Sequence, residues 1–312
     1  MEDKYIDLHT HTNYSDGLFT PRQLLERAKA YNLAAISIAD HDTTRAYTSE
    51  TFEIAKNLSI ELVPGIEFST RDDDSNKYHI LGLLIDLESK DLYKLTHRLN
   101  EERIAETKLV CGLLDGLGWN IDQEKLLDEP GTITKAHISR AVLFNEKNKQ
   151  KLHKEFNKMP TEGEFCEAIL IKGKPAYVKG GHHLHPSEAI ETIKKAGGLS
   201  LLAHPSYNLI MGESFESLCN KFVNWGINGF EAINVQYDRS NNDNEVQHID
   251  QFINYSKEHN LVISGGSDFH HDNEELIGKF IDLGFKNYDK KVPYSVLENL
   301  KKEQQWLRSQ AH

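Results

Sequence analysis

Residues of the kind that bind divalent metals recur along this chain of 312 amino acids, close to short apolar runs. The first are His9 and His11, which directly follow the apolar run 5–8. Side chains two residues apart in a strand point the same way, so this pair is suited to hold one metal ion. Because an isolated pair of this type is more often an ordinary surface or half-buried feature, the interpretation depends on the rest of the chain.

Five apolar runs end in a histidine, aspartate or glutamate, or are followed by one within a few residues. Barrel enzymes carry their catalytic groups at the carboxyl ends of parallel strands, so ligands far apart in the sequence can meet in space. We therefore predict a single metal centre. Its expected ligands are His9, His11, Asp16, His41, Glu67, His79, His204, Asp268 and His270.

The elements that must position these residues alternate between strand and helix. The stretch Thr20-Pro21-Arg22-Gln23 is a capping box with proline at the first helical position, and it predicts a helix to about Tyr31. The βαβαβ alternation predicts an α/β fold with a mostly parallel sheet and helices outside it. After it, strand signals lie at residues 34–39, 60–63 and 78–85, and a helix signal lies at 46–57.

A block of about 80 residues interrupts this alternation and carries no strand signal. A long charged helix is expected from Leu92 to Gly118, with further helices at 123–127 and 135–144. We interpret the block as a helical insertion that caps the sheet domain. The expected division is a barrel domain at 1–100 and 181–312 and an insertion at 101–180, with strands resuming at 199–203, 229–235 and 261–264.

The composition is that of an ordinary soluble protein, with 38% hydrophobic and 27% charged residues and no apolar run long enough for a membrane span or signal peptide. Cys111, Cys166 and Cys219 lie far apart and indicate free thiols, so we expect a cytoplasmic protein. A net charge of −12 argues against non-specific binding to nucleic-acid backbones. It does not exclude an anionic substrate, because bound metals invert the local charge. No membrane or obligate protein partner is expected.

The metal-type residues fall in six motifs, and their order and content resemble the polymerase and histidinol phosphatase (PHP) family. The motifs are D-L-H-T-H-T-N-Y-S-D-G, I-A-D-H-D-T, P-G-I-E-F-S, H-I-L-G, L-A-H-P and G-S-D-F-H. The resemblance covers nearly the whole chain. It implies a distorted seven-stranded β/α barrel, the (β/α)7 PHP fold, that holds two to three divalent metals, manganese, zinc or iron, and hydrolyses phosphate esters.

By match to the family pattern, Glu67 bridges two of three metals. The implied sets are His9, His11, Glu67 and Asp268 for one metal, Glu67, His79 and His204 for a second, and Asp16, His41 and His270 for the third. The implied reaction is in-line attack on phosphorus by a metal-activated hydroxide, without a separate protein base. Neutral imidazoles and three carboxylates around three divalent ions leave a net positive charge, which suits a phosphate dianion.

The insertion matches a bacterial subgroup of this family in its K-A-H-I-S-R and P-A-Y-V segments. That subgroup is associated with removing the 3′-phosphate from nucleoside 3′,5′-bisphosphates and with 5′ to 3′ exonuclease action on short RNA or DNA. A helix start with arginine nearby is suited to a second phosphate. The residues expected to bind the 5′-phosphate of such a nucleotide or short oligonucleotide are Arg103, Lys135, His137, Ser139, Arg140 and Tyr177.

Three other functions compete with a nucleotide phosphoesterase. A histidinol-phosphate phosphatase would need a pocket for an imidazole and an amino alcohol instead of a second phosphate anchor. An amidohydrolase-type hydrolase of C–N bonds would need a bridging lysine that the sequence does not place. A non-catalytic module of the kind attached to DNA polymerases is disfavoured because no ligand is missing from the motifs.

Several polar neighbours are interpreted more cautiously. His182, His183 and His185 precede a helix, and we expect solvated loop residues there. His271 is expected to point away from His270 as a rim residue. Glu231 either reaches the site or makes a structural hydrogen bond. One of Asp40 and Asp42, which flank His41, is expected to hold metal ligands in place without binding a metal itself.

Overall fold

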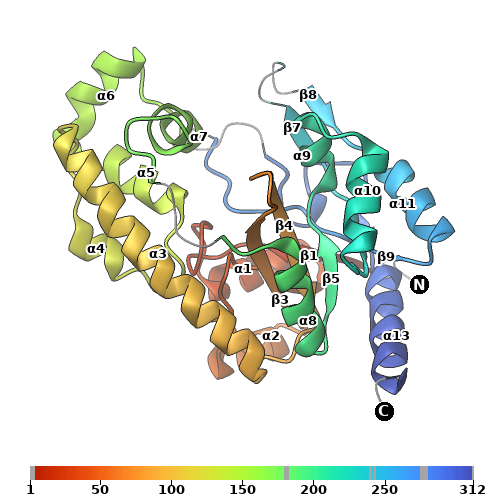
Figure 1. Cartoon of the computed structure of the whole chain (residues 1–312). Helices are drawn as coiled ribbons and strands as arrows, with labels where there is room; N and C mark the ends of the chain where they lie inside the picture. Colours follow the sequence, from red (N-terminus) through yellow and green to blue (C-terminus); the bar gives the residue numbers. More distant parts are fainter. Residues whose placement is uncertain (1–3, 179–182, 239–240, 242–243, 275–279, 311–312) are drawn as a thin grey trace.

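The computed structural model describes residues 4–178, 183–238, 241, 244–274 and 280–310. Its main feature is an eight-stranded sheet with the order β10-β1-β2-β3-β4-β5-β6-β9. Figure 1 shows the sheet at the centre of the molecule with helices around it. The strands are β1 (Tyr5–Thr10), β2 (Leu33–Ile38), β3 (Glu61–Arg71), β4 (Lys77–Leu83), β5 (Leu199–Leu202), β6 (Gly229–Ile233), β9 (Val262–Gly265) and β10 (Val292–Pro293), and outside this sheet β7 (Gln236–Asp238) pairs with β8 (Asn244–Val246).

The sheet curls until the chain after β9 meets β1. The backbone amide of Asp268 donates to the carbonyl of His9 at 3.0 Å, and the amide of His11 donates to the carbonyl of Phe269 at 2.9 Å. Apolar side chains from the strands fill the interior, against which α13 (Tyr294–Gln310) packs. The predicted distorted β/α barrel is therefore confirmed.

Strand β4 departs from the parallel pattern, because it runs antiparallel to both β3 and β5. The sequence signal for the third strand ends at Val63, before Glu67, whereas β3 continues to Arg71. It continues because pairing with β4 extends from Gly65 to Arg71, after pairing with β2 has ended. Glu67 thus lies inside a β-hairpin rather than after a strand.

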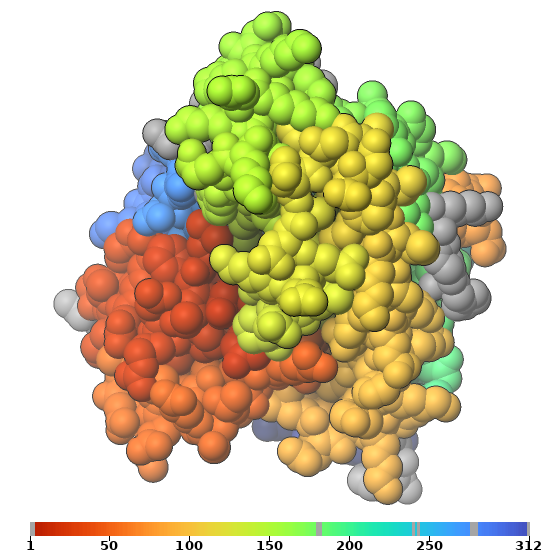
Figure 2. Space-filling view, turned by 90° about the vertical axis from the view of Figure 1, so that its left-hand side faces the viewer, coloured from red at the N-terminus to blue at the C-terminus, as the bar shows by residue number. Residues whose placement is uncertain are grey.

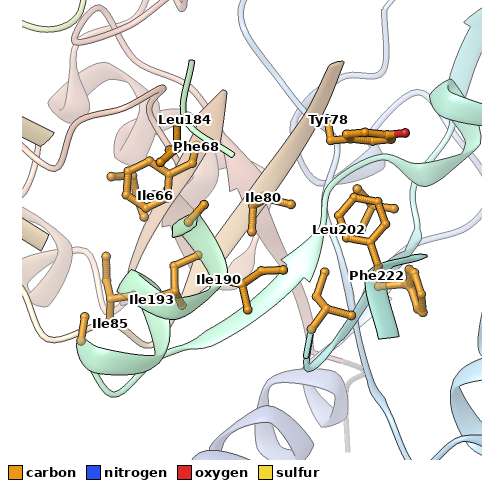
Figure 3. Packing of buried hydrophobic residues seen from close by; sticks show 14 of the residues in the cluster. Ile66, Phe68, Tyr78, Ile80, Ile85, Leu184, Ile190, Ile193, Leu202 and Phe222 are labelled. Carbon is orange, nitrogen blue, oxygen red and sulfur yellow. The ribbon is translucent and has the colours of Figure 1, made fainter. Parts of the chain in front are cut away.

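Helices cover the outside of the barrel and pack on it through apolar faces. Figure 3 shows Ile190 and Ile193 of α8 among outward-facing residues of β3 and β4 such as Ile66 and Ile80. Thr20 forms the predicted capping box with the third residue of α1. The helices in this part are α1 (Pro21–Ala30), α2 (Ser49–Asn57), α8 (Pro186–Lys195), α9 (Pro205–Ile210), α10 (Phe215–Asn224), α11 (Ile249–Glu258) and the short 3₁₀ turn η4 (Leu283–Phe285).

The predicted insertion contains only helices and loops in its described part, and we call residues 101–178 the cap. Its long first helix belongs to two packing units: Leu92 and Leu95 join a barrel cluster, whereas Val110 and Leu114 join a separate cap cluster. The expected boundary at position 100 falls inside this continuous helix, and the division into two domains stays a prediction. The helices are α3 (Lys90–Gly116), α4 (Gln123–Leu127), α5 (Lys135–Leu143), η1 (Glu146–Asn148), α6 (Lys149–Phe156), α7 (Glu162–Phe165) and the π-helical turn η2 (Cys166–Leu170).

None of the helices formed by the described residues combines the length and the apolar character that a membrane crossing requires.

Candidate metal centre

The nine predicted ligands lie in one cluster, with the carboxylate of Glu67 at its centre. Oε1 of Glu67 lies 3.0 Å from His204 Nε2 and 3.1 Å from His79 Nδ1. The two imidazoles are themselves 3.2 Å apart at those nitrogens. Oε2 of Glu67 lies 3.0 Å from His41 Nδ1. Both oxygens of one buried carboxylate therefore face imidazoles, as a bridging ligand requires.

The β3–β4 hairpin directs Glu67 and His79 to the same face. Glu67 pairs with Leu81 across the hairpin and Ser69 pairs with His79, so both ligands share the row of residues that faces the barrel interior. Alternate side chains in a strand point to opposite faces. Figure 3 accordingly shows Ile66 and Phe68, the sequence neighbours of Glu67, in the outer hydrophobic cluster.

A bulge in β1 aims His9 at this centre. Between the pairs Asp7–Ile36 and Thr10–Ile38, β1 advances by three residues while β2 advances by two. Such an extra residue re-aims the side chains that follow it, and bulges are common beside active sites. His9 Nε2 consequently lies 3.3 Å from Glu67 Oε1.

Asp268 completes the set that contains the two N-terminal histidines. Its Oδ1 lies 3.1 Å from His11 Nε2 and 3.5 Å from His9 Nε2. Ligand atoms of His9, His11, Glu67 and Asp268 all lie within 4.8 Å of one another. Asp268 (φ +57°) and His204 (φ +30°) both have left-handed backbone conformations, which cost energy for non-glycine residues and concentrate at functional sites.

Asp16 organises the third predicted set on the other side of His11. Its Oδ1 lies 3.3 Å from His270 Nε2, and its Oδ2 lies 3.4 Å from His41 Nε2. His11 Nδ1 is 3.5 Å from the same Oδ1, so the two nitrogens of His11 face different carboxylates. The third set therefore adjoins the first through one imidazole.

The electrostatics of the metal-free cluster show why cations belong there. Burial by itself would raise the pKa of Glu67, but nearby His41, His9 and His79 outweigh it and hold that pKa well below its usual range. Burial has the dominant effect at His11 and lowers its pKa to about 4. The carboxylates thus stay ionised in a buried place, where only a compensating positive charge makes them stable.

The donor set fits divalent metals. His9 Nε2 is buried and has no hydrogen-bond partner among the described residues, although it faces Glu67 and Asp268. An orphaned imidazole nitrogen between two carboxylates is what a metal ion would satisfy. Imidazole and carboxylate ligands suit zinc, manganese or iron better than calcium. The assignment of each ligand to a metal stays a prediction.

Metal binding at the Asp16 set should release protons. Burial would lower the pKa of His41 and His270, but Asp16 with Glu67 raises the first to about 10, and Asp16 with Asp268 raises the second to about 9. Both rings are therefore protonated at neutral pH and must lose a proton to bind a metal. Apparent affinity for Zn²⁺ or Mn²⁺ should rise as the pH increases toward those values.

Calorimetry of the metal-free protein in buffers of different ionisation enthalpy measures this release. We expect about two protons released at pH 7 when this set fills, and a smaller number at pH 9. A heat of binding that is independent of the buffer would contradict the prediction.

Glu231 makes the structural hydrogen bonds that were one of its two expected roles. Fully buried, it accepts a hydrogen bond from His9 Nδ1 at 3.0 Å and from the backbone amide of His204 at 2.6 Å. A proton fixed on Nδ1 leaves Nε2 of His9 free as the ligand atom.

Replacing Glu231 with glutamine should weaken the metal bound by His9 by about 10- to 100-fold, because the amide no longer orients the ring as a carboxylate does. Competition with a fluorescent chelator measures this affinity. Glu188→Gln, which removes an exposed carboxylate that pairs with Arg98, is the matched control. Equal affinities in the two variants would show that Glu231 does not orient His9.

Asp40 and Asp42 support the site from behind in different ways. Asp40 accepts hydrogen bonds from Thr12 and from Ser15 Oγ, which lies 3.3 Å from His11 Nδ1. Asp42 accepts a hydrogen bond from the backbone amide of Ser69 at 3.0 Å. Each aspartate fixes a loop that carries a ligand.

Sequence reasoning missed Asp7 as a supporting residue. Asp7 is fully buried and accepts hydrogen bonds from the amide and hydroxyl of Ser267 and from the amide of Gly284. These bonds fix the turn that carries Asp268 against β1. The available signal was a carboxylate within an otherwise apolar strand, which must find partners when buried.

Arg140 has a different place from the one expected of a substrate-binding residue. Its buried guanidinium donates to Glu162 at 2.6 Å and to the backbone carbonyls of Asp16 and Gly17. The cap also contacts this loop at Gly131, where an added Cβ would lie 1.7 Å from the carbonyl oxygen of Tyr14. Figure 2 shows the cap, yellow to lime, resting on the red N-terminal part.

Three further cap residues do not line the cavity that adjoins the cluster. His137 is buried and completes a capping box with Thr134 at the start of α5. Ser139 is fully buried and Tyr177 is half-buried. The tertiary structure thus gives α5 a packing role, because its apolar face belongs to the cap cluster, and among its residues Lys135, the first, lines the cavity.

The cavity beside the metal cluster has a volume of about 310 Å³ and lies between the hairpin and the cap. Asp16, His41 and His79 contribute to its wall. Arg103 and Lys135, two of the residues predicted to bind substrate, line it. Two further cations that the sequence interpretation missed, Arg71 and Lys77, line it as well.

The other histidines have mixed outcomes. His183 is exposed as expected, but it lines the cavity. His185 is not a solvated loop residue: it caps α8 by accepting a hydrogen bond from the amide of Ser187. His271 is not a rim residue, because it is buried beside Glu162. His182 lies outside the described residues.

The fold agrees with comparisons to known proteins. Residues 7–195 match the PHP domain family, and the chain belongs to this family. A 5′-3′ exoribonuclease of Haemophilus influenzae is 31% identical over 289 residues, which cover 91% of this chain and 96% of that protein. A 3′,5′-nucleoside bisphosphate phosphatase of Chromobacterium violaceum is 28% identical over 270 residues, covering 85% and 87%.

Solved structures share the fold over the full length. A chain from Bifidobacterium adolescentis, assigned as a metal-dependent phosphoesterase, superposes with a TM-score of 0.74 at 23% identity and 95% coverage of both chains. A structure of an amidohydrolase from Chromobacterium violaceum gives a TM-score of 0.70 at 26% identity and 96% coverage of both chains.

Proposed function

We propose that this protein is a metal-dependent phosphoesterase of nucleotides. It removes the 3′-phosphate of nucleoside 3′,5′-bisphosphates, trims short 5′-phosphorylated oligonucleotides from the 5′ end, or does both. The observation that carries this proposal is the buried cluster around Glu67, with six imidazoles and three carboxylates, which opens into a cavity with a cationic wall. The names of the exoribonuclease and bisphosphate phosphatase relatives support it.

The proposed cofactors are two to three divalent ions, manganese, zinc or iron, held by the nine residues named above. Ions of this kind supply activation of the attacking water and neutralise charge on the phosphoryl oxygens. The chain's own contribution is position: Glu231 orients His9, the Ser15–Asp40 pair steadies His11, and Arg140 holds the loop that carries Asp16. Preorganisation of this kind provides much of the rate enhancement in metal sites.

We further propose that the cap selects the substrate, because it forms one wall of the cavity while the ligands come from the barrel. A cavity of about 310 Å³ suits a nucleotide or the end of a short chain better than a duplex.

Cys111, Cys166 and Cys219 are free thiols, which supports a reducing, cytoplasmic location.

Hydrolysis of adenosine 3′,5′-bisphosphate, a 5′-phosphorylated oligonucleotide and histidinol phosphate tests the proposal, with Mn²⁺ or Zn²⁺ supplied. We expect the two nucleotide substrates to be cleaved faster. A preference for histidinol phosphate would replace this function by the alternative within the same family. Cleavage of C–N bonds is disfavoured because the group that would bridge the metals is the carboxylate of Glu67 rather than a lysine.

A further inference from the structure

Two cations lie opposite each other at the turn end of the β3–β4 hairpin, and among the described residues neither side chain has a hydrogen-bond or ion-pair partner. Arg71 and Lys77 are directly paired across the hairpin, two residues beyond the pair Ser69 and His79. They therefore continue the row that brings His79 to the metal cluster, and both line the same cavity. Like charges directly opposite each other in a sheet are destabilising. The hairpin alone gives no reason for this pair.

A third cation meets them from the cap. Lys135, the first residue of α5, lines the opposite wall of the cavity. Burial and the charges of Lys77 and Arg103 lower the pKa of Lys135. The positive charges of the barrel and the cap therefore repel each other across the cavity.

These three cations differ from Arg103, which is already engaged. Arg103 lies 3.6 Å from Asp42 and 3.5 Å from Glu106. Within the described residues, no hydrogen bond or ion pair engages the side-chain nitrogens of Arg71, Lys77 or Lys135. The available positive charge therefore lies on the hairpin and at the start of α5 rather than on α3.

We propose that Arg71, Lys77 and Lys135 form an anion subsite that binds the second phosphate of the substrate while the first lies at the metal cluster. This inference rests on the proposed phosphoesterase function and deepens it. Its ligand is a phosphate monoester on the 5′ end of a nucleoside or of a short oligonucleotide. A dianion among three cations relieves their mutual repulsion, and charged hydrogen bonds to each cation add to its binding.

The test compares substrates that differ only in the second phosphate. Arg71→Met and Lys77→Met, singly and together, are assayed with adenosine 3′,5′-bisphosphate and with adenosine 3′-monophosphate. We expect the double variant to lose about 100-fold or more in kcat/KM for the bisphosphate, mainly through KM, because it removes two charged hydrogen-bond donors. Turnover of the monophosphate should change by less than about threefold. Equal changes for both substrates, or none, would overturn the proposal.

Controls separate a binding role from a structural one. Lys174→Met removes an exposed lysine that does not line the cavity, and it should leave the ratio between the two substrates unchanged. Relief of like-charge repulsion should leave the melting temperature of the hairpin variants unchanged or raise it. Lys135→Met, on the opposite wall, should reduce the preference for the bisphosphate in the same direction.

A binding measurement keeps this inference separate from the proposed function. Calorimetry with adenosine 5′-monophosphate should show weaker binding to the double variant than to the wild-type protein, whether or not either hydrolyses an ester. Unchanged binding would overturn the subsite. Failure of the metal-loaded wild-type protein to cleave any phosphate ester, including p-nitrophenyl phosphate, would instead overturn the proposed function. Oligonucleotides with a 5′-phosphate or a 5′-hydroxyl distinguish a chain end from a free nucleotide as the ligand.

Discussion

Replacing Glu67 with glutamine should remove metals from the centre and reduce kcat/KM by about a thousandfold or more. Its Oε1 lies 3.0 Å from His204 Nε2 and its Oε2 lies 3.5 Å from His11 Nε2, so the single substitution affects the first and second proposed metals at once. A glutamine has the same shape but lacks the charge, and its amide nitrogen would face an imidazole. Bound metals contribute several kcal/mol of transition-state stabilisation, and losing this contribution accounts for the expected decrease in kcat/KM.

Mass spectrometry of bound metals and steady-state kinetics together check this prediction. Glu102→Gln is the matched control, because Glu102 lines the same cavity but contacts Arg98 rather than the cluster. The control should keep its metals and its activity. A Glu67→Gln protein that retains the wild-type metal content and turnover would rule out a bridging role for this carboxylate.

Replacing Arg140 with methionine should destabilise the protein by about 3–5 kcal/mol, because Glu162 would remain buried without its partner. The carbonyls of Asp16 and Gly17 would lose their donors as well. We therefore expect the loop that carries Asp16 to loosen, and the metal of the third set to be lost before the others.

Urea unfolding and metal stoichiometry separate these two effects. The double variant Arg140→Met/Glu162→Met removes both charges and should recover much of the stability, since a buried ion pair replaced by apolar groups is often neutral. It should not recover the metal, because the loop carbonyls still lack a donor. If the Arg140→Met variant keeps its stability and metals but loses its preference for 5′-phosphates, Arg140 binds substrate instead of supporting the loop.

Several of the candidate ligands could be picked out from the sequence, because they follow or end an apolar run and carry a side chain that binds metals. His9, His41 and Asp268 are of this kind. The strand and helix alternation predicted the α/β class, and the resemblance to the PHP family implied the barrel that the fold confirms. Local periodicity was sufficient for the α/β class because it is written in neighbouring residues.

The direction in which each ligand side chain points depended on the tertiary structure. The bulge in β1 and the antiparallel course of β4 decide which face His9 and Glu67 occupy, and both arise from pairing between distant segments. The partner of Arg140 likewise depends on packing: a buried guanidinium must be paired, and Glu162 and two loop carbonyls pair it. Arg71 and Lys77 are six residues apart in the sequence, yet the hairpin makes them opposite neighbours on a cavity wall. Residue chemistry thus determined what this centre can bind, whereas strand pairing and cap packing decided where each charge points, because contacts between distant residues set the direction of every side chain.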